Sequence, residues 1–374
     1  MIMTNVSNVK NCFGCGVCAV SCPKNIIYIR LNDDGFYQPF IDEPDKCIHC
    51  KICVENCAFV HKDLALLNRV TGSWCGWSND STVLARSASG GLGFEIARHL
   101  LHSGYKVCGV RYNAPERRAE HFIADTEDAL AATMGSKYIQ SYTVDGFSAI
   151  NRKDSYLVVG TPCQIDSFRR YIRRLKIEDH FVLMDFFCHC VPSMHAWREY
   201  LRLAQKSAGA ITSVVWRDKT PGWHDSWAML VKGSEGTLKS RLSQGDLFYK
   251  FFLGDVCCGK ACMKQCKYKW DKSSADIRIG DAWGDTYSRN DAGVSTIVSF
   301  TDKGREVVES LNGCTINPHP LEVAAEGQMH ENVHRAAAYG MFMFLLRKGI
   351  QLPAAGWNAA FIINKILRRL KIKI

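Results

Sequence analysis

The sequence contains no stretch close to the roughly 18 unbroken apolar residues that a membrane-spanning helix requires. Its first residues, MIMTNVSNVKNC, lack the apolar run of a secretory signal peptide. The 374 residues also contain no low-complexity tract and no repeat of solenoid length. These absences argue against an integral membrane protein and a repeat architecture, and we expect a globular protein located in the cytoplasm.

Cysteine, in contrast, is abundant, with 18 residues in the chain. In a reducing compartment such cysteines seldom form disulfides, so metal ligation or redox chemistry is the better explanation. The formal net charge is +10, with a basic cluster in the final LRRLKIKI. Such a charge attracts nucleic acid, anionic lipid, an acidic redox partner or a phosphorylated cofactor, or it simply belongs to a solvated surface.

Two runs of cysteines near the N-terminus share the spacing C-x2-C-x2-C-x3-C. In bacterial ferredoxins the first three cysteines of such a run hold one [4Fe-4S] cluster and the fourth ligates the other cluster. Gly14 and Gly16 allow the backbone of the first run to approach inorganic sulfide. We therefore expect one cluster on Cys12, Cys15, Cys18 and Cys57, and a second on Cys47, Cys50, Cys53 and Cys22.

The segment between the runs, NIIYIRLNDDGFYQPFID, alternates apolar and polar residues around an NDDG turn and predicts a β-hairpin. Together these features predict an α+β, ferredoxin-type domain at residues 1–65. Zinc is the alternative, but zinc sites use two C-x2-C pairs and do not need the additional cysteines of each run. One departure from the ferredoxin pattern is Ala58, which follows Cys57 in place of proline.

The remaining chain predicts an α/β core with a mainly parallel sheet. Apolar strands are expected at 156–160, 181–187 and 275–280, and helical segments lie between them. Residues 87–112 predict a loop, an amphipathic helix and a strand, whereas residues 66–86 resemble a linker that ends in a turn.

A third group of cysteines is expected where these strands end, because ligands collect outside the carboxyl ends of strands in open α/β sheets. Cys163 follows the strand at 156–160, Cys188 follows the strand at 181–187, and Cys262 and Cys266 precede the strand at 275–280. We expect these four to hold a third [4Fe-4S] cluster. Two cysteines, Cys190 and Cys258, are reserve ligands, and the alternatives for Cys163 are a reactive thiol beside His189 or a quiet buried residue. Small core or surface roles are expected for the other cysteines, Cys75, Cys108, Cys257 and Cys314.

Two polar segments could bind a cofactor. SASGG, residues 87–91, precedes a helix N-terminus, which favours a phosphate group, although an ordinary helix cap explains it equally well. GSKYIQS, residues 135–141, offers Lys137, Tyr138 and Gln140 as polar and aromatic contacts for an isoalloxazine ring or its phosphates.

These motifs appear in a fixed order behind the double ferredoxin run: SASGG, GSKYIQS, GTPCQI, DFFCHCVPS, WRDK…GW and ADIRIGDAWG. In this order the chain resembles the coenzyme F420-reducing hydrogenase/dehydrogenase beta-subunit family from about residue 8 to 330. It is most similar to bacterial stand-alone members, which are often encoded beside polysaccharide-assembly genes. The resemblance implies that residues 66–160 and 161–330 are the two parts of an α/β, flavin-binding catalytic core, with a basic and apolar helical tail at 331–374.

The resemblance also implies specific cofactor contacts. FAD would contact Ser89, Gly90, Gly91, Ser136, Lys137, Tyr138 and Gln140, and a [4Fe-4S] cluster on Cys163, Cys188, Cys262 and Cys266 would lie beside it. The sequence departs from the family pattern at two places, so the identity of one ligand of this cluster stays open. Cys190 stands where the family usually has glycine after Cys-His, and three residues separate Cys262 from Cys266 where the family usually has two.

The implied activity is that of an FAD- and [4Fe-4S]-dependent oxidoreductase. Electrons would pass between an organic substrate or a deazaflavin-type coenzyme at FAD and an external carrier, with a ferredoxin or a reductase as protein partner. Lys264, Lys267 and Lys269 would raise the potential of the adjacent cluster, and His189 is a candidate proton donor as well as a candidate structural residue.

Three other functions stay open. One is reduction of an intermediate in polysaccharide assembly, and another is a non-catalytic, ferredoxin-like electron adaptor. The third, a zinc-stabilised nucleic-acid binder, is suggested by charge alone, and we expect no nucleic-acid partner. The C-terminal tail is expected either to rest on a membrane surface or to dock on the core as a final helix.

Overall fold

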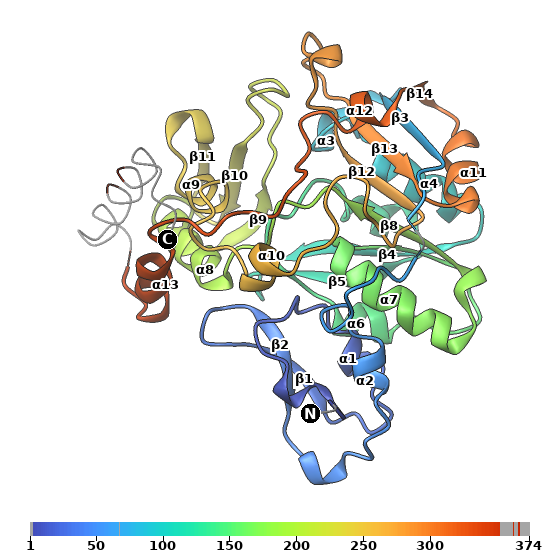
Figure 1. Ribbon diagram of the computed structural model, residues 1–374. Helices are drawn as coiled ribbons and strands as arrows, with labels where there is room; N and C mark the ends of the chain where they lie inside the picture. The colour runs from blue at the N-terminus through green and yellow to red at the C-terminus, as the bar shows by residue number, and fades with distance from the viewer. Residues whose placement is uncertain (1–2, 67, 352–361, 363–365, 367–374) are drawn as a thin grey trace.

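The computed structural model describes residues 3–66 and 68–351, together with residues 362 and 366. Figure 1 shows a small N-terminal module in blue beneath two larger parts, one built on a wide sheet and the other on a small sheet with helices. The wide sheet has nine strands in the order β14-β3-β13-β12-β8-β7-β4-β5-β6. Their bounds are β3 Gly72–Ser78, β4 Lys106–Asn113, β5 Arg118–Ala124, β6 Ser141–Tyr142, β7 Tyr156–Val159, β8 Phe181–Phe186, β12 Ile277–Asp281, β13 Ser295–Ser299 and β14 Cys314–Pro318.

The centre of this sheet is parallel, as the sequence predicts. Strands β12, β8, β7 and β4 pair in parallel, while the β12–β13, β13–β3, β3–β14 and β4–β5 pairs are antiparallel. The expected strands at 156–160, 181–187 and 275–280 correspond to β7, β8 and β12, which are neighbours. Their carboxyl ends therefore lie side by side at one edge of the sheet.

Both faces of the central strands are buried, which explains their unbroken apolar sequence. Leu157 and Val182 pack on one face against α4 (Leu92–His102) and α11 (Asp302–Glu309), together with α5 (Glu127–Ala131). Their neighbours Val158 and Leu183 pack on the opposite face against α6 (Val144–Ser148) and α7 (Pro162–Leu175). This arrangement leaves only the strand ends open for a site.

The segment at 66–86 is not a linker, in contrast to our expectation. Residues Gly72–Ser78 form β3, which pairs with β13 on one side and β14 on the other, and Ser81–Arg86 form α3. The glycine- and serine-rich sequence of β3 resembles a turn. Pairing on both edges with strands more than 200 residues later determines its conformation.

The N-terminal module contains the expected hairpin, with β1 (Ile27–Leu31) antiparallel to β2 (Tyr37–Ile41). Each cysteine run leads into one short helix, α1 (Val17–Val20) or α2 (Ile52–Glu55), and 3-10 turns lie at Val6–Asn8 and Pro44–Lys46. The hairpin and the two short helices form the blue module of Figure 1, and the wide sheet lies above it.

A second lobe, which we did not expect from the sequence, is built on a three-stranded antiparallel sheet. Its helix α13 packs Phe342 and Leu346 against the lobe, and Arg347 donates to Asp34 of the N-terminal module at 2.9 Å. The elements of this lobe and of the loops around it are β9 Ile211–Val215, β10 Ala228–Gly233, β11 Thr237–Arg241, α8 Met194–Ala208, α9 Leu247–Phe252, α10 Lys260–Lys264, α12 Leu321–Ala324 and α13 Tyr339–Arg347, with 3-10 turns at Glu178–His180, Leu242–Gln244 and Asp285–Tyr287.

The C-terminal tail expected at 331–374 is described as far as residue 351 and includes α13, which packs on the second lobe. Apart from residues 362 and 366, the rest of the tail considered for membrane contact lies outside the described residues. Within the described part of the chain, none of the helices combines the length and apolar character needed to cross a bilayer.

A fully buried ion pair joins the central strands to the cysteine-rich loop. Arg278 on β12 donates from Nε and Nη2 to the two carboxylate oxygens of Asp185 on β8, each at 2.7 Å, and both side chains are fully buried. The same guanidinium donates from Nη1 to the carbonyls of Tyr268 and Trp270. Ser273 completes the set by donating to Asp185 at 2.6 Å. The pair thus fixes the loop that carries Cys262 and Cys266 against the strand ends.

We predict that Arg278→Met destabilises the fold by about 3–5 kcal/mol, because it leaves a buried carboxylate without its partner. The double variant Arg278→Met/Asp185→Leu should recover much of that loss, since it removes both charges. Urea unfolding of the two variants and the wild type measures the difference. A single variant as stable as the wild type would contradict this view of the pair.

Candidate iron–sulfur and cofactor site

The first expected cysteine group is assembled in the N-terminal module. Cys12, Cys15, Cys18 and Cys57 lie close enough for their thiolates to repel one another, and all but Cys12 are buried. Burial, reinforced by these neighbours, raises the pKa of Cys12 and of Cys57 to about 12. Thiols grouped in this way cannot all ionise without a nearby cation, so their arrangement fits a bound metal cluster.

The second group consists of Cys22, Cys47, Cys50 and Cys53. Cys53 is near the other three, and burial raises its pKa to about 11. The fourth cysteine of each run therefore joins the other run, which is the crossed arrangement expected from the spacing. Cys50 and the neighbouring Ile48 are exposed, so this group is the one nearest to solvent.

The third group also comes together. Cys163, Cys188, Cys262 and Cys266 line one small cavity at the ends of β7 and β8. Burial is the main reason that the pKa of Cys163 is raised, and neighbouring thiolates raise it further. Burial also raises the pKa of Cys188 to about 12 and that of Cys262 to about 11. The donor set and the raised pKa values resemble those of the first group, so these residues fit a third metal cluster.

The local sequence explains how Cys163 reaches this cavity. Thr161 and Gln164 form a capping box at the start of α7, with Gln164 accepting from the Thr161 backbone N–H at 2.8 Å. Pro162 occupies the first turn, where no N–H is needed. Cys163 consequently lies in the first turn of a 14-residue helix, whose positive end stabilises an anionic centre.

The three lysines expected beside the third group have different roles. Lys269 donates to the carbonyls of Cys188 and His189 at 2.6 and 2.8 Å, and its charge favours the Cys188 thiolate. Lys267 instead donates to three carbonyls of the N-terminal module, at Ala58, His61 and Asp63, and Lys264 is exposed. Lys269 is thus the lysine positioned to affect the electrostatics of this cavity.

The first and third groups are neighbours. The Cys15 thiol donates to Ser167 at 3.2 Å, and Ser167 lies one turn after Cys163 on α7. Cys15 also contributes to the electrostatic environment of Cys163, and Phe13 of the first run lines the cavity of the third group. Side chains of a single helix, α7, therefore connect the two groups.

A larger cavity of about 420 Å³ adjoins the third group. Cys188, His189 and Cys190 line both cavities, so the two are adjacent. The volume lies within the usual range for cofactor sites. Gly91 and Gly93 line it at the start of α4, where the backbone N–H groups of a helix lack partners within the helix.

Five of the seven residues expected at FAD line this larger cavity: Ser89, Gly91, Ser136, Lys137 and Tyr138. The other two lie elsewhere. Gly90 packs against β3 and β13, where a Cβ atom would overlap the Gly76 carbonyl. Gln140 is 3% exposed and contacts the N-terminal module, donating to the Phe13 carbonyl and accepting from the Tyr37 N–H. Gln140 therefore positions the first cysteine run.

Arg217, from the WRDK motif, is a site residue to which the sequence assigned no role. It donates to Tyr138 at 3.1 Å, forms an ion pair with Asp281 at 3.0 Å and lies over the rings of Trp227 and Trp283. The GSKYIQS, WRDK and GDAWG motifs thus meet at one wall of the larger cavity. The three motifs are far apart in the sequence, so only their occurrence together in one chain could have suggested that Arg217 contacts Tyr138 and Asp281.

Two lysines stabilise the loops around the same cavity. Lys219 donates to the carbonyls of Ser89 and Ala292 at 2.8 and 2.6 Å, and it also contacts the Leu84 carbonyl. Lys137 donates to the carbonyls of residues 132, 133 and 134 at the end of α5. Burial lowers the pKa of Lys137 to about 7, and the three carbonyls oppose this effect by favouring the ammonium form.

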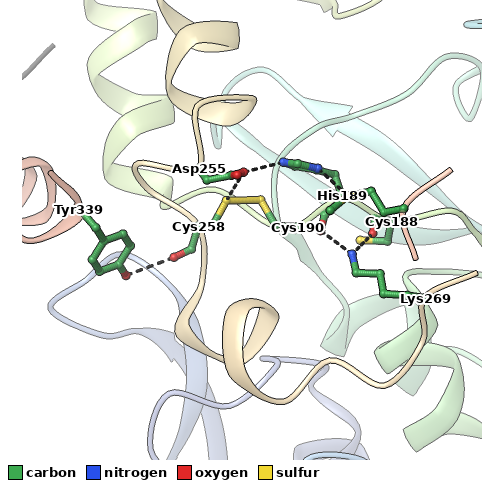
Figure 2. Close-up of a disulfide and its surroundings, with 8 residues drawn as sticks. Cys188, His189, Cys190, Asp255, Cys258, Lys269 and Tyr339 are labelled. Carbon is green, nitrogen blue, oxygen red and sulfur yellow. Dashed lines mark hydrogen bonds and ion pairs between the residues drawn. A yellow bond between two sulfur atoms is a disulfide. The ribbon is translucent and has the colours of Figure 1, made fainter. Parts of the chain in front are cut away.

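The two reserve cysteines pair with each other rather than joining the third group. Cys190 and Cys258 form a disulfide, contrary to the expectation that the cysteines remain unpaired (Figure 2). His189 lies beside it and contacts Asp255 through Nε2 at 2.8 Å and the Met329 sulfur through Nδ1. The candidate proton donor His189 is therefore held in place by two partners at the rim of both cavities.

Comparison with known families agrees with this organisation. Residues 11–60 match the 4Fe-4S dicluster domain, and residues 153–317 match the C terminus of the "Coenzyme F420 hydrogenase/dehydrogenase, beta subunit". The chain is thus similar to the coenzyme F420 hydrogenase/dehydrogenase beta-subunit family over residues 153–317. The two matches cover separate parts of the chain and support an iron–sulfur protein of oxidoreductase type.

Among solved structures, a chain of the F420-reducing [NiFe] hydrogenase complex from Methanosarcina barkeri, in a xenon derivative, is similar to this chain. The sequences are 15% identical, the TM-score is 0.47, and the match covers 83% of this chain and 94% of the other. No curated protein matches the sequence.

We predict that Gly14→Ala removes about four irons per chain, the content of one cluster. Gly14 has a φ of +66°, and an added Cβ would overlap the Gln140 amide and the Tyr37 carbonyl. Iron and sulfide analysis of the anaerobic protein measures the loss.

Gly313→Ala is the matched control, because Gly313 has a φ of +71° but open space around it. This variant should lose about 1 kcal/mol of stability and keep its iron. Equal iron contents in the two variants would show that the close approach at Gly14 is not required.

Proposed function

We propose that this chain is an iron–sulfur flavoprotein oxidoreductase with three [4Fe-4S] clusters and one FAD. The observation that carries the proposal is the succession of neighbouring sites from the N-terminal module to the larger cavity. The second group, which contains the exposed Cys50, is followed by the first group, the third group and the larger cavity in that order. Such an order suits one-electron transport from the surface to a cofactor where pairs of electrons are exchanged.

FAD fits the larger cavity because of the residues that line it. The start of α4, at Gly91 and Gly93, brings the positive end of the helix to the cavity, which favours a phosphate, and Lys137 and Lys269 add positive charge. Tyr138, Trp227 and Trp283 supply aromatic surface for a flat ring. When bound, FAD would exchange electron pairs with an organic substrate and single electrons with a cluster.

The residues of the chain would control where this exchange takes place. Arg217 and Asp281 neutralise each other while holding Tyr138 at the cavity wall, and His189 is positioned at the rim by Asp255. The substrate is therefore expected at the part of the cavity bordered by His189, close to the third group. A deazaflavin-type coenzyme or another conjugated molecule has the flat shape that this aromatic surface favours.

A redox partner protein would bind near the second group. Cys50 is exposed, and Ile48 beside it is 57% exposed. A cluster held there would lie close to the surface, and the apolar side chain next to it suits a protein–protein contact. A ferredoxin or a reductase would meet this requirement.

We expect anaerobically purified protein to contain about twelve irons and twelve acid-labile sulfides per chain, the content of three cubane clusters. Cys262→Ser should reduce the iron content by about four, because it removes one ligand of the third group. Cys257→Ser is the control and should leave the iron content unchanged, since Cys257 is buried against α13 and lines neither cavity. A wild-type content near eight irons would refute the third cluster.

Flavin binding is tested separately by Ser136→Asp, which places a negative charge in the cavity where the proposal places FAD. We expect at least a tenfold weaker retention of FAD, about 1.4 kcal/mol, with unchanged iron content. Ser148→Asp on the exposed side of α6 is the control. Flavin fluorescence after acid release gives the occupancy, and equal occupancy in both variants would place the flavin elsewhere.

A further inference from the structure

The cysteine pair Cys190–Cys258 lies between the third group and the larger cavity. Cys190 lines both cavities, and Cys258 is directly behind it, with a Cα–Cα separation of 6.0 Å. It is the only disulfide among residues 3–66 and 68–351. Figure 2 shows the pair between Cys188 on one side and Tyr339 on the other.

The two loops that carry this pair also carry ligands of the third group. Cys190 is two residues after Cys188, and Cys258 is four residues before Cys262. The loops are joined by backbone hydrogen bonds from Ser193 to the Cys257 carbonyl at 2.9 Å and from Gly259 to the Val191 carbonyl at 3.0 Å. These bonds keep the sulfur atoms facing each other whether or not they are bonded.

The pair is closed to external thiols. Cys190 is 6% exposed and Cys258 is 0% exposed, and the Tyr339 hydroxyl donates to the Cys258 carbonyl at 3.1 Å from the outer side. Thiol–disulfide exchange requires a thiolate to reach a sulfur atom directly. Glutathione or a thioredoxin would therefore react slowly, and the nearest source of electrons is the adjacent third group.

We propose that Cys190 and Cys258 form a redox-active pair that stores two electrons beside the larger cavity. In the forward step, two single electrons from a one-electron donor and two protons from solvent break the S–S bond and give two thiols. In the reverse step, the two thiols lose the same electrons and protons, and the bond forms again. The pair would thus be a second two-electron acceptor, in addition to the flavin, and this inference rests on the proposed function because the clusters deliver the electrons.

The position of Cys190 gives the pair a role in catalysis. Cys190 lines the cavity where the organic substrate is expected, whereas Cys258 lines neither cavity. Cys190 is therefore the cysteine of the pair that is nearer to the expected substrate, and Cys258 is the partner that closes the bond.

One experiment measures the redox state of the pair in the complete, cluster-loaded chain without oxygen. The protein is treated with reduced methyl viologen or with glutathione and quenched in acid. It is then unfolded and alkylated, and mass spectrometry measures the alkylated fraction of the Cys190 and Cys258 peptides. We expect both cysteines to be alkylated after viologen treatment and to remain at least tenfold less alkylated after glutathione treatment. Alkylation that is the same with both reagents would overturn the proposal.

Variants test where the electrons go. In a reductive titration, Cys190→Ser should take up about two electrons fewer per chain than the wild type, because the disulfide is a two-electron couple. Cys257→Ser, the control in the same loop, should match the wild type. In the Cys163→Ser variant, reduced viologen should reduce the Cys190–Cys258 disulfide more slowly than it does in the wild type, because the third group supplies the electrons. Circular dichroism checks that this variant is folded, and an unchanged rate in a folded variant would overturn that route.

The failure of this inference is distinguishable from failure of the proposed function. Bleaching of the iron–sulfur absorption without alkylation of the pair would overturn the inference and leave the proposed function in place. Stoichiometric zinc on the pair would also overturn it, because His189, Cys190, Asp255 and Cys258 lie within 4.8 Å of one another and an ion there would require free thiolates. Protein that contains no iron would instead refute the proposed function itself.

Discussion

The buried pair of Arg278 and Asp185 is the interaction on which the arrangement of the site depends. It joins β8 to β12 in the middle of the sheet, and its remaining nitrogen holds the carbonyls of Tyr268 and Trp270. Because β8 delivers Cys188 and the segment ending at Tyr268 delivers Cys262 and Cys266, one guanidinium sets the distance between ligands from separate parts of the chain. A buried charge pair is a costly way to join two strands. An apolar contact in its place would not orient the carbonyls of Tyr268 and Trp270, whereas the guanidinium does so through its hydrogen bonds.

The N-terminal module is attached to the core by polar contacts that converge on the first cysteine run. Gln140 holds Phe13 and Tyr37, Ser167 accepts from Cys15, and Lys267 binds three carbonyls near Cys57. Electron transfer is sensitive to the distance between centres, so contacts made directly by the ligand loops control that distance better than contacts elsewhere on the module. The same segment, α7, provides both Cys163 and Ser167, and it therefore positions the first and third groups together.

The sequence predicts the local part of this structure well. Cysteine spacing predicts the crossed arrangement of the two ferredoxin groups, and apolar runs predict β7, β8 and β12 and hence the meeting of Cys163 with Cys188. In contrast, the sequence does not reveal β3, because its glycines and serines form a strand only between β13 and β14. The role of Gln140 is likewise hidden, since its partners lie more than 100 residues away. The pairing of Cys190 with Cys258 across 68 residues depends on two loops that the ion pair and the backbone hydrogen bonds bring together.

The cysteine groups and the larger cavity have different electrostatic requirements. The three cysteine groups need positive charge nearby, which the start of α7 and Lys269 provide at the third group. The proposed FAD in the larger cavity would need a surface for a flat ring and anionic phosphates, and the tryptophans, Lys137 and the start of α4 suit these requirements. Lys269 lines both cavities and donates to the backbone between them. In the proposed function, this single ammonium group would stabilise added electrons on either side and so favour transfer across the boundary where Cys188, His189 and Cys190 line both cavities.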